Sequence, residues 1–211
     1  MPTVPPPSGA PHARGSVLHG FRAALVDLWG QEALEEVGRR LPMATRMATI
    51  DALVLPFEWV ALGHVVAWHE ALWGGPLGAD EERLTRLIAR SIELGFGRFQ
   101  SAFFTNATPE RLVARAQELW RYQHTHGEVS VALDERSAAV TLRDHPYVGH
   151  PASRRVTAES YRHIVTASLG RPVRAAWAMT GRASIPPGSA AGSFASPGAL
   201  DAPSLVVHLS W

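Results

Sequence analysis

The chain of 211 residues contains no cysteine and no lysine. Without thiols, it can form no disulfide, no thiolate nucleophile and no sulfur-ligated metal centre. All 20 basic residues are arginine, which excludes Schiff-base and PLP chemistry and the lysine of a P-loop. The 19 acidic residues leave a formal net charge of +1. This balance gives no sign of the concentrated basic surface that nucleic acids require, so we expect no nucleic-acid partner.

The chain also lacks a long hydrophobic run. Its longest strongly apolar stretch, residues 59–73, is interrupted by His64, His69 and Glu70 and is shorter than the ~20 residues that span a bilayer. Residues 1–13 are rich in proline and contain no apolar segment, which is not the pattern of a signal peptide. We therefore expect a disordered tail over 1–13, no membrane span and a cytoplasmic location.

What the chain does contain is typical of a folded protein. Hydrophobic residues make up 46% and charged residues 18% of the sequence, which distinguishes it from disordered chains. The length suits one domain with a sizeable core. We therefore expect residues 14–211 to form a single domain.

Apolar residues recur at helical spacing through the first two thirds of the chain. The pattern predicts helices over 17–29, 34–41, 56–74, 80–95 and 108–127, with a short helical piece within 44–53. Two of these have clear start signals, because Asp80 and Thr108 are good N-caps that precede acidic residues. The helix over 56–74 is apolar around almost its whole circumference, which predicts a position at the centre of the domain.

After Gly127 the apolar period changes from 3.6 to 2. Strands over 129–133 and 138–142 form a hairpin in which Asp134 to Ser137 make a four-residue loop. A helix over 155–169 and strands over 173–179 and 205–211 complete the pattern, and residues 181–204 between the last two strands predict a flexible loop inside the domain. The fold class is therefore α+β, with N-terminal helices packed on a small C-terminal antiparallel sheet in the order strand-strand-helix-strand-strand.

Several sequence motifs, taken in order, resemble those of a family of proteins of about two hundred residues that is restricted to myxobacteria. They are RGSV at Arg14, PFEWV, ALWGG, IARSIELGFGRFQ, TPERL, ELWRYQHTHGEV and, at the end, LVVHLSW. That family is in turn similar to the ligand-binding fold of 4-vinyl-reductase domains, TRAPP vesicle-tethering subunits and heme nitric-oxide sensors. The resemblance implies helices against an antiparallel sheet with a pocket between the layers. This chain departs from it by lacking cysteines and by carrying the long 181–204 segment.

The ten histidines do not form a recognisable metal motif. His64 and His69 lie five apart and so do not share a helix face. His124 and His126 follow a helix C-terminus, where the dipole favours a cationic imidazole. The resemblance raises the question of heme, but neither Tyr122–His126 nor Tyr161–Val165 matches the Tyr-x-Ser-x-Arg clamp that heme sensors use on the propionates. We expect no metal and no cofactor.

Enzymatic motifs are absent as well. The sequence contains no G-x-S-x-G elbow, and its Gly95-Phe96-Gly97 lacks the third glycine and the βαβ setting of a dinucleotide site. We therefore predict no catalytic residues.

Aromatic and histidine side chains give the best candidate for a site, because such residues can line an apolar cavity. An ordinary packed core is the alternative interpretation. The candidate ligand-binding residues are His64, Trp68, His69, Phe99, Phe103, Trp120 and Trp177.

These observations favour a non-catalytic, cytoplasmic sensor or adaptor domain that binds a small apolar ligand. The alternative is a protein-interaction module without ligand that homodimerises, as tethering subunits do. An enzyme of unknown reaction is the third possibility.

Overall fold

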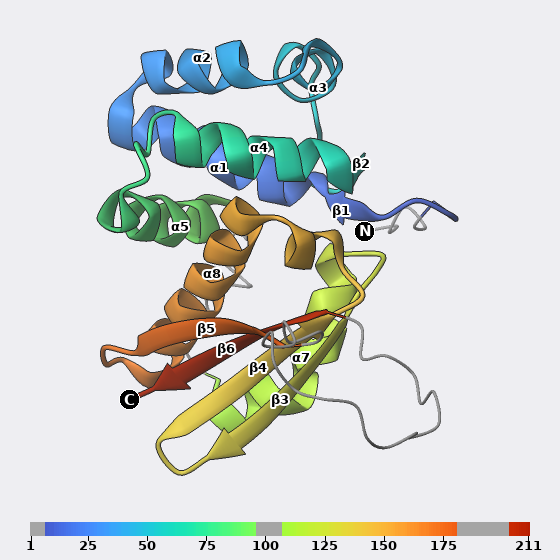
Figure 1. The fold of residues 1–211 in the computed structure, drawn as a ribbon. Coiled ribbons are helices and arrows are strands. Elements are labelled where there is room, and N and C mark those ends of the chain that lie inside the picture. Colours follow the sequence, from blue (N-terminus) through green and yellow to red (C-terminus); the bar gives the residue numbers. More distant parts are fainter. Residues whose placement is uncertain (1–6, 96–106, 181–202) are drawn as a thin grey trace, which may run out of the picture.

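A computed structural model describes residues 7–95, 107–180 and 203–211 of the chain (Figure 1). Helices occupy the first part of the chain and a four-stranded antiparallel sheet the last part. In Figure 1 the N-terminal helices stack above the sheet, and the long helix α8 (Pro151–Leu169) connects the two layers. The predicted α+β class, with helices packed on a C-terminal sheet, is confirmed.

The first two helices agree with the predicted boundaries. α1 covers Gly15–Trp29 and α2 covers Gln31–Arg40. Gly30 separates them with a φ of 80°, a left-handed conformation that favours glycine. The short piece predicted within 44–53 is observed as the helical turn α3 (Met43–Arg46) followed by a π-helical turn, η1 (Met47–Asp51).

Two short strands correct the prediction for the N-terminal region. β1 (His12–Arg14) pairs antiparallel with β2 (Trp59–Ala61). The predicted third helix is therefore wrong in its first turns, because α4 covers only Leu62–Gly74. The tail expected over 1–13 also overlaps the fold, since Ala13 is fully buried. Residues 1–6 of that tail lie outside the described ranges.

Contacts of Arg14 explain why residues 59–61 are extended rather than helical. Its guanidinium carbon lies 3.9 Å from the centroid of the Trp59 ring, and Nη1 donates a 2.6 Å hydrogen bond to the carbonyl oxygen of Phe57. Its Nε also donates to the carbonyl oxygen of Tyr122, at 3.4 Å. A side chain that contacts two distant segments at once, residues 57–59 and Tyr122, fixes their backbones, and this tertiary contact overrides local helical preference.

α4 is largely buried, as the sequence predicted. Seven of its thirteen residues are buried, and Trp68 is fully inaccessible. Gly63 and Glu70 remain exposed. The helix is thus covered on most sides but keeps a narrow exposed strip.

The predicted N-caps of the next two helices are confirmed. Asp80 Oδ1 accepts hydrogen bonds from two backbone N–H groups at the start of α5 (Glu81–Gly95), and the Thr108 hydroxyl accepts one at the start of α7 (Pro109–Gln123). α7 ends at Gln123 rather than near Gly127, because His124 is extended and forms a bridge to Ala13 of β1.

The sheet has the strand order β3 (Glu128–Asp134), β4 (Ser137–Arg143), β6 (Ser204–Ser210), β5 (Arg174–Thr180), all antiparallel. The last two strands along the chain, β5 and β6, are neighbours in the sheet. The first hairpin is tighter than predicted: Asp134 pairs directly with Ser137, so only two residues form the turn.

One face of the sheet faces the helices. α7 packs on β3, and α8 packs on β5 and β6. α8 begins at Pro151, ahead of the predicted start at Arg155, because Pro151 is well suited to the first helical position. On this face every second residue of the central strands is buried, as a period of 2 requires: Ala138, Val140, Leu142, Leu205, Val207 and Leu209.

Some predictions fall outside the part of the chain that the structure describes. Phe99 and Phe103 belong to 96–106, and most of the predicted loop over 181–204 belongs to 181–202. Within the described ranges, no helix has the length and apolar character needed to cross a bilayer.

Candidate functional site

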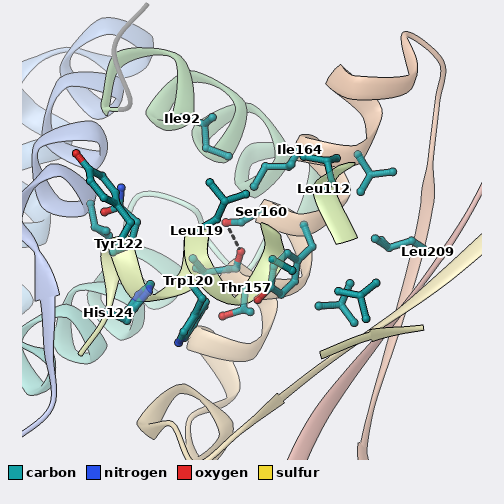
Figure 2. Close-up of a pocket in the computed structure, with 18 of the residues that line it drawn as sticks. Ile92, Leu112, Leu119, Trp120, Tyr122, His124, Thr157, Ser160, Ile164 and Leu209 are labelled. Carbon is teal, nitrogen blue, oxygen red and sulfur yellow. Dashed lines mark hydrogen bonds between the residues drawn. The ribbon is translucent and has the colours of Figure 1, made fainter. Parts of the chain in front are cut away.

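A cavity of about 220 Å³ lies between the sheet and the helices α1, α5, α7 and α8 (Figure 2). Most of its lining is apolar. α7 presents one continuous face to it, because residues three and four apart share a side of a helix. The residues of this face are Leu112, Val113, Ala116, Leu119, Trp120 and Gln123.

The strands supply the opposite wall. Alternate residues of β3, β4 and β6 point inward, so each strand contributes side chains from the same face of the sheet. These are Val131, Leu133, Ala138, Val140 and Leu209. In Figure 2, Leu112, Ile164 and Leu209 lie on one side of the cavity, whereas Trp120 and His124 lie on the other.

Imidazole and aromatic rings gather at that second side. Trp120 stacks on His124 with 3.9 Å between the ring centroids. The Tyr147 ring lies 5.6 Å from that of His124, 5.0 Å from that of His69 and 4.3 Å from that of His145. We call His69, His124, His145 and Tyr147 the histidine–tyrosine cluster. Its members come from α4, from the end of α7 and from the segment after β4, so the fold assembles it from distant parts of the sequence.

The cluster contains polar atoms without hydrogen-bond partners. His69 Nδ1 lies 2.9 Å from Ser153 Oγ, and this contact orients the ring. Its Nε2 has no hydrogen-bond partner among the described residues. Buried polar groups are normally paired, and an unpaired one is destabilising. Cavity-lining residues hold five such atoms with no partner among the described residues: His69 Nε2, His124 Nδ1, Tyr147 Oη, Thr157 Oγ1 and Tyr161 Oη.

All ionisable groups of the cluster are held in the neutral form. Burial lowers the pKa of His69 to about 3, with further lowering from His124 and His150. Burial also lowers the pKa of His124 to about 3. For His145, burial and then three neighbouring histidines lower the pKa to about 2. Burial raises the pKa of Tyr147 above the usual range of a phenol, so the cluster carries no charge at neutral pH.

This neutrality corrects the expectation for His124. Its position after a helix C-terminus suggested a cationic imidazole that the dipole stabilises. The structure buries the ring against Trp120 instead, and desolvation of the charged form outweighs the dipole. Among the described residues, no Asp, Glu or Arg lines the cavity.

Two of the predicted site residues meet at the cavity. His69 and Trp120 both line it, and both contact Tyr147 through their rings. Trp120 is fixed by a 2.8 Å hydrogen bond from Nε1 to the carbonyl oxygen of His126. Phe99 and Phe103 lie outside the described ranges.

The structure places the other predicted site residues elsewhere. His64 Nδ1 lies 2.9 Å from Thr45 Oγ1, and Trp68 Nε1 donates a 2.7 Å hydrogen bond to Thr49 Oγ1. Both therefore belong to the packing between α4 and the α3–η1 segment. Trp177 lies on β5, with the guanidinium of Arg154 5.5 Å from its ring centroid.

Sequence reasoning missed four cavity-lining residues that carry an unpartnered polar atom: His124, Tyr147, Thr157 and Tyr161. The last two had a usable signal, since they lie four apart with Ile164 on one helix face and place hydroxyl groups among apolar neighbours. Tyr147 had no such signal, because it lies in a single 3-10 turn, Pro146–Gly149.

Within the described ranges, no group of three or more His, Cys, Asp or Glu residues could hold a metal ion.

No protein-family model matches the chain, and no curated protein matches it. Solved structures do. An Fe(II) unliganded H-NOX mutant from K. algicida is 8% identical at a TM-score of 0.56, covering 93% of this chain and 96% of that one. An oxygen-binding H-NOX domain related to soluble guanylate cyclases is 10% identical at a TM-score of 0.52, covering 93% and 94%. The fold resembles that of H-NOX domains. The similarity to the fold of heme nitric-oxide sensors is thereby confirmed, whereas membership of the myxobacterial family stays a prediction.

A third match is a structure that concerns the modulation of heme redox potential by protein-induced porphyrin distortion. It is 9% identical at a TM-score of 0.54, covering 94% of this chain and 99% of that one.

Heme itself does not fit the cavity between the sheet and the helices. The volume of about 220 Å³ is below the ~300 Å³ at which pockets for drug-sized ligands begin. A propionate buried in this cavity would need a cationic partner, and no arginine is among the described lining residues. His69 Nε2 is a free imidazole nitrogen, but the size and charge of the site disagree with a porphyrin.

Proposed function

We propose that this chain is a non-catalytic sensor or adaptor domain that binds a small, mainly apolar ligand in the cavity between the sheet and helices α1, α5, α7 and α8. The observation that carries the proposal is the combination of an apolar lining with five unpartnered polar atoms. Binding sites have this composition, because apolar walls supply affinity and a few polar groups fix orientation. An inert core would pair or omit those polar groups.

The electrostatics support binding rather than catalysis. The histidines of the cluster stay neutral far below neutral pH, whereas a general base works best with a pKa near the operating pH. The described lining also holds no carboxylate. The position of the cavity, between α8 and the sheet, would let a bound ligand alter the packing of the two layers.

Native mass spectrometry of the purified protein tests the proposal. We expect a bound small molecule on the wild type and its loss in Ala116→Phe, because Ala116 lines the cavity from α7 and a larger side chain fills it. Ala114→Phe is the matched control, since Ala114 is exposed on the same helix, and it should retain the ligand. An empty wild-type protein that no small apolar compound stabilises against heat would contradict the proposal.

A homodimeric adaptor is the second candidate, and one observation favours it. β5 is an edge of the sheet, and no described strand pairs with its outer side. Six of its seven residues, all except Trp177, are exposed. A free strand edge can pair with a second copy of the chain. The same native spectra distinguish the candidates, because an adaptor of this kind gives a dimer mass with no small molecule attached.

A further inference from the structure

We infer that the ligand is an uncharged molecule whose apolar body carries a hydroxyl or carbonyl group, and that His69, His124 and Tyr147 bind this group. The inference rests on the proposed function and specifies the chemistry of its ligand. It follows from how the polar atoms are distributed, from the absence of charge in the described lining and from the size of the cavity.

Three residues with unpartnered polar atoms, His69, His124 and Tyr147, gather at one end of the mainly apolar cavity. The rings of His69 and His124 lie 5.0 Å and 5.6 Å from that of Tyr147, and each of the three residues has one buried polar atom without a partner in the described part of the chain. Figure 2 shows Leu112, Ile164 and Leu209 away from the side where His124 lies. A ligand that satisfies both ends must therefore be apolar at one end and polar at the other.

The chemistry of the three groups suits a neutral partner. A phenol hydroxyl both donates and accepts, and a neutral imidazole nitrogen does one or the other according to its tautomer. A carbonyl oxygen can accept from Tyr147, and a hydroxyl can also donate to an imidazole nitrogen. Hydrogen bonds to these atoms thus replace those that the polar group of the ligand makes with water before it binds.

A charged ligand has no counter-ion in this site. The described lining contains neither Arg nor carboxylate. Burial keeps the pKa of His69 and of His124 at about 3, so no imidazolium is available at neutral pH to pair with a carboxylate or phosphate. Burying an unpaired charge is far more costly than burying a neutral polar group. Fatty-acid anions and phosphorylated molecules are therefore excluded.

The volume sets the size of the ligand. An engineered cavity of about 150 Å³ binds benzene, so a cavity of about 220 Å³ accommodates about nine non-hydrogen atoms by the same ratio. Octan-1-ol and octan-2-one have this size. Octanoate and octane have nearly the same shape but differ in charge and in polarity.

Binding of these four compounds at pH 7, measured by calorimetry and by tryptophan fluorescence, tests the inference. Octane is supplied from a saturated vapour phase. We expect octan-1-ol and octan-2-one to bind at least tenfold more tightly than octanoate and octane. In Tyr147→Phe their affinity should fall about tenfold while that for octane stays unchanged. Thr141→Val removes a hydroxyl from the outer face of the sheet, away from the cavity lining, and should leave all affinities unchanged.

A second measurement separates binding from folding. Tyr147→Phe deletes a buried hydroxyl that has no partner among the described residues, so without ligand its melting temperature should equal or exceed that of the wild type. Octanoate binding as tightly as octan-1-ol would overturn the inference. Equal affinity for octane and octan-1-ol, unaffected by Tyr147→Phe, would overturn it while leaving the proposed function intact. If none of the compounds binds and the native spectra show an empty protein, the proposed function itself fails.

Discussion

A methyl group on Gly20 of α1 would lie 2.5 Å from the carbonyl oxygen of Ser91 on α5. Gly95 adds to this close approach, because a Cβ there would lie 3.1 Å from Gly20 Cα and 3.0 Å from the carbonyl oxygen of Ser16. The backbones of α1 and α5 thus touch where Gly20 and Gly95 meet. Since Ser16, Ser91 and Gly95 also line the cavity, the separation of these helices contributes to its shape.

Gly20→Ala should therefore destabilise the protein by about 1–3 kcal/mol, as overpacking in a core does. The free energy of unfolding in urea measures it. Gly63→Ala is the control: a Cβ at this exposed helical position meets nothing within 4 Å, and stability should stay the same or rise slightly. Equal effects of the two substitutions on the free energy of unfolding would show that α1 and α5 can move apart without loss of stability.

Trp68→Ala should lower the free energy of unfolding by about 3–5 kcal/mol, because Trp68 is fully buried and its Nε1 bonds to Thr49. Trp68→Phe keeps a ring but loses that hydrogen bond, and should cost about 1–2 kcal/mol. Phe57→Ala, at a side chain that is 52% exposed, should change stability by less than about 0.5 kcal/mol. A loss below about 1 kcal/mol for Trp68→Ala, typical of surface sites, would mean that α4 is peripheral.

Replacing residues 181–203 by a short Gly/Ser turn should leave the melting temperature within a few degrees of wild type. The reason is the register of β5 and β6, in which Thr180 pairs directly with Ser204 and their hydroxyls lie 2.6 Å apart. Loop-closure entropy also changes by only ~0.6 kcal/mol per doubling of length. Differential scanning calorimetry measures the melting temperature. A shortened protein that does not fold would contradict the pairing of these strands.

Stability should fall steeply as the pH drops below about 6.5. His69, His124 and His145 have a pKa of about 3, about 3 and about 2 in the folded protein, against ~6.5 in an unfolded chain. Between these values the unfolded state binds more protons, so stability increases with pH. Each group contributes up to about 1.4 kcal/mol per pH unit, and three together should unfold a protein of ordinary stability between about pH 5 and pH 3.

Circular dichroism across a pH series follows this transition. His124→Phe keeps a ring against Trp120 but removes one of the three titrating groups. The slope of the free energy of unfolding against pH should therefore fall by about a third. His208→Gln, at a side chain that is exposed on β6, is the control for removing a histidine outside the cluster. A flat stability profile between pH 6.5 and pH 4 would show that the buried histidines are protonated in the folded state.

Most helices and all four strands of the sheet were predictable because their signals are local. The alternation in β3 and β4 and the caps at Asp80 and Thr108 are properties of neighbouring residues, and the structure confirms them. β1 and β2 could not be predicted in this way. Three residues are too few to show a period, and Trp59 and Val60 extend the apolar pattern of the helix that follows. Only their pairing with residues 12–14 makes them strands.

The cavity was only partly predictable for a related reason. The sequence identifies aromatic and histidine residues, but not which side of a buried helix each one takes. His69 faces the cavity and Trp68, its neighbour, faces Thr49. Tyr147 becomes part of the site only because a 3-10 turn brings it against His69 and His124. Whether a buried polar atom has a hydrogen-bond partner depends on the assembled core, so the residue pattern cannot show it.

The strand order of the sheet also constrains how the chain folds. β6 lies between β4 and β5, so β5 has no partner in the described sheet until residues 204–210 are in place. The β3–β4 hairpin can form early from local contacts, whereas the other half of the sheet must wait for a strand that is distant from β4 along the chain. Until β6 inserts, the edges of both β4 and β5 are open to other chains. The slow step of folding, and the moment of greatest risk of aggregation, should therefore be the insertion of this central strand.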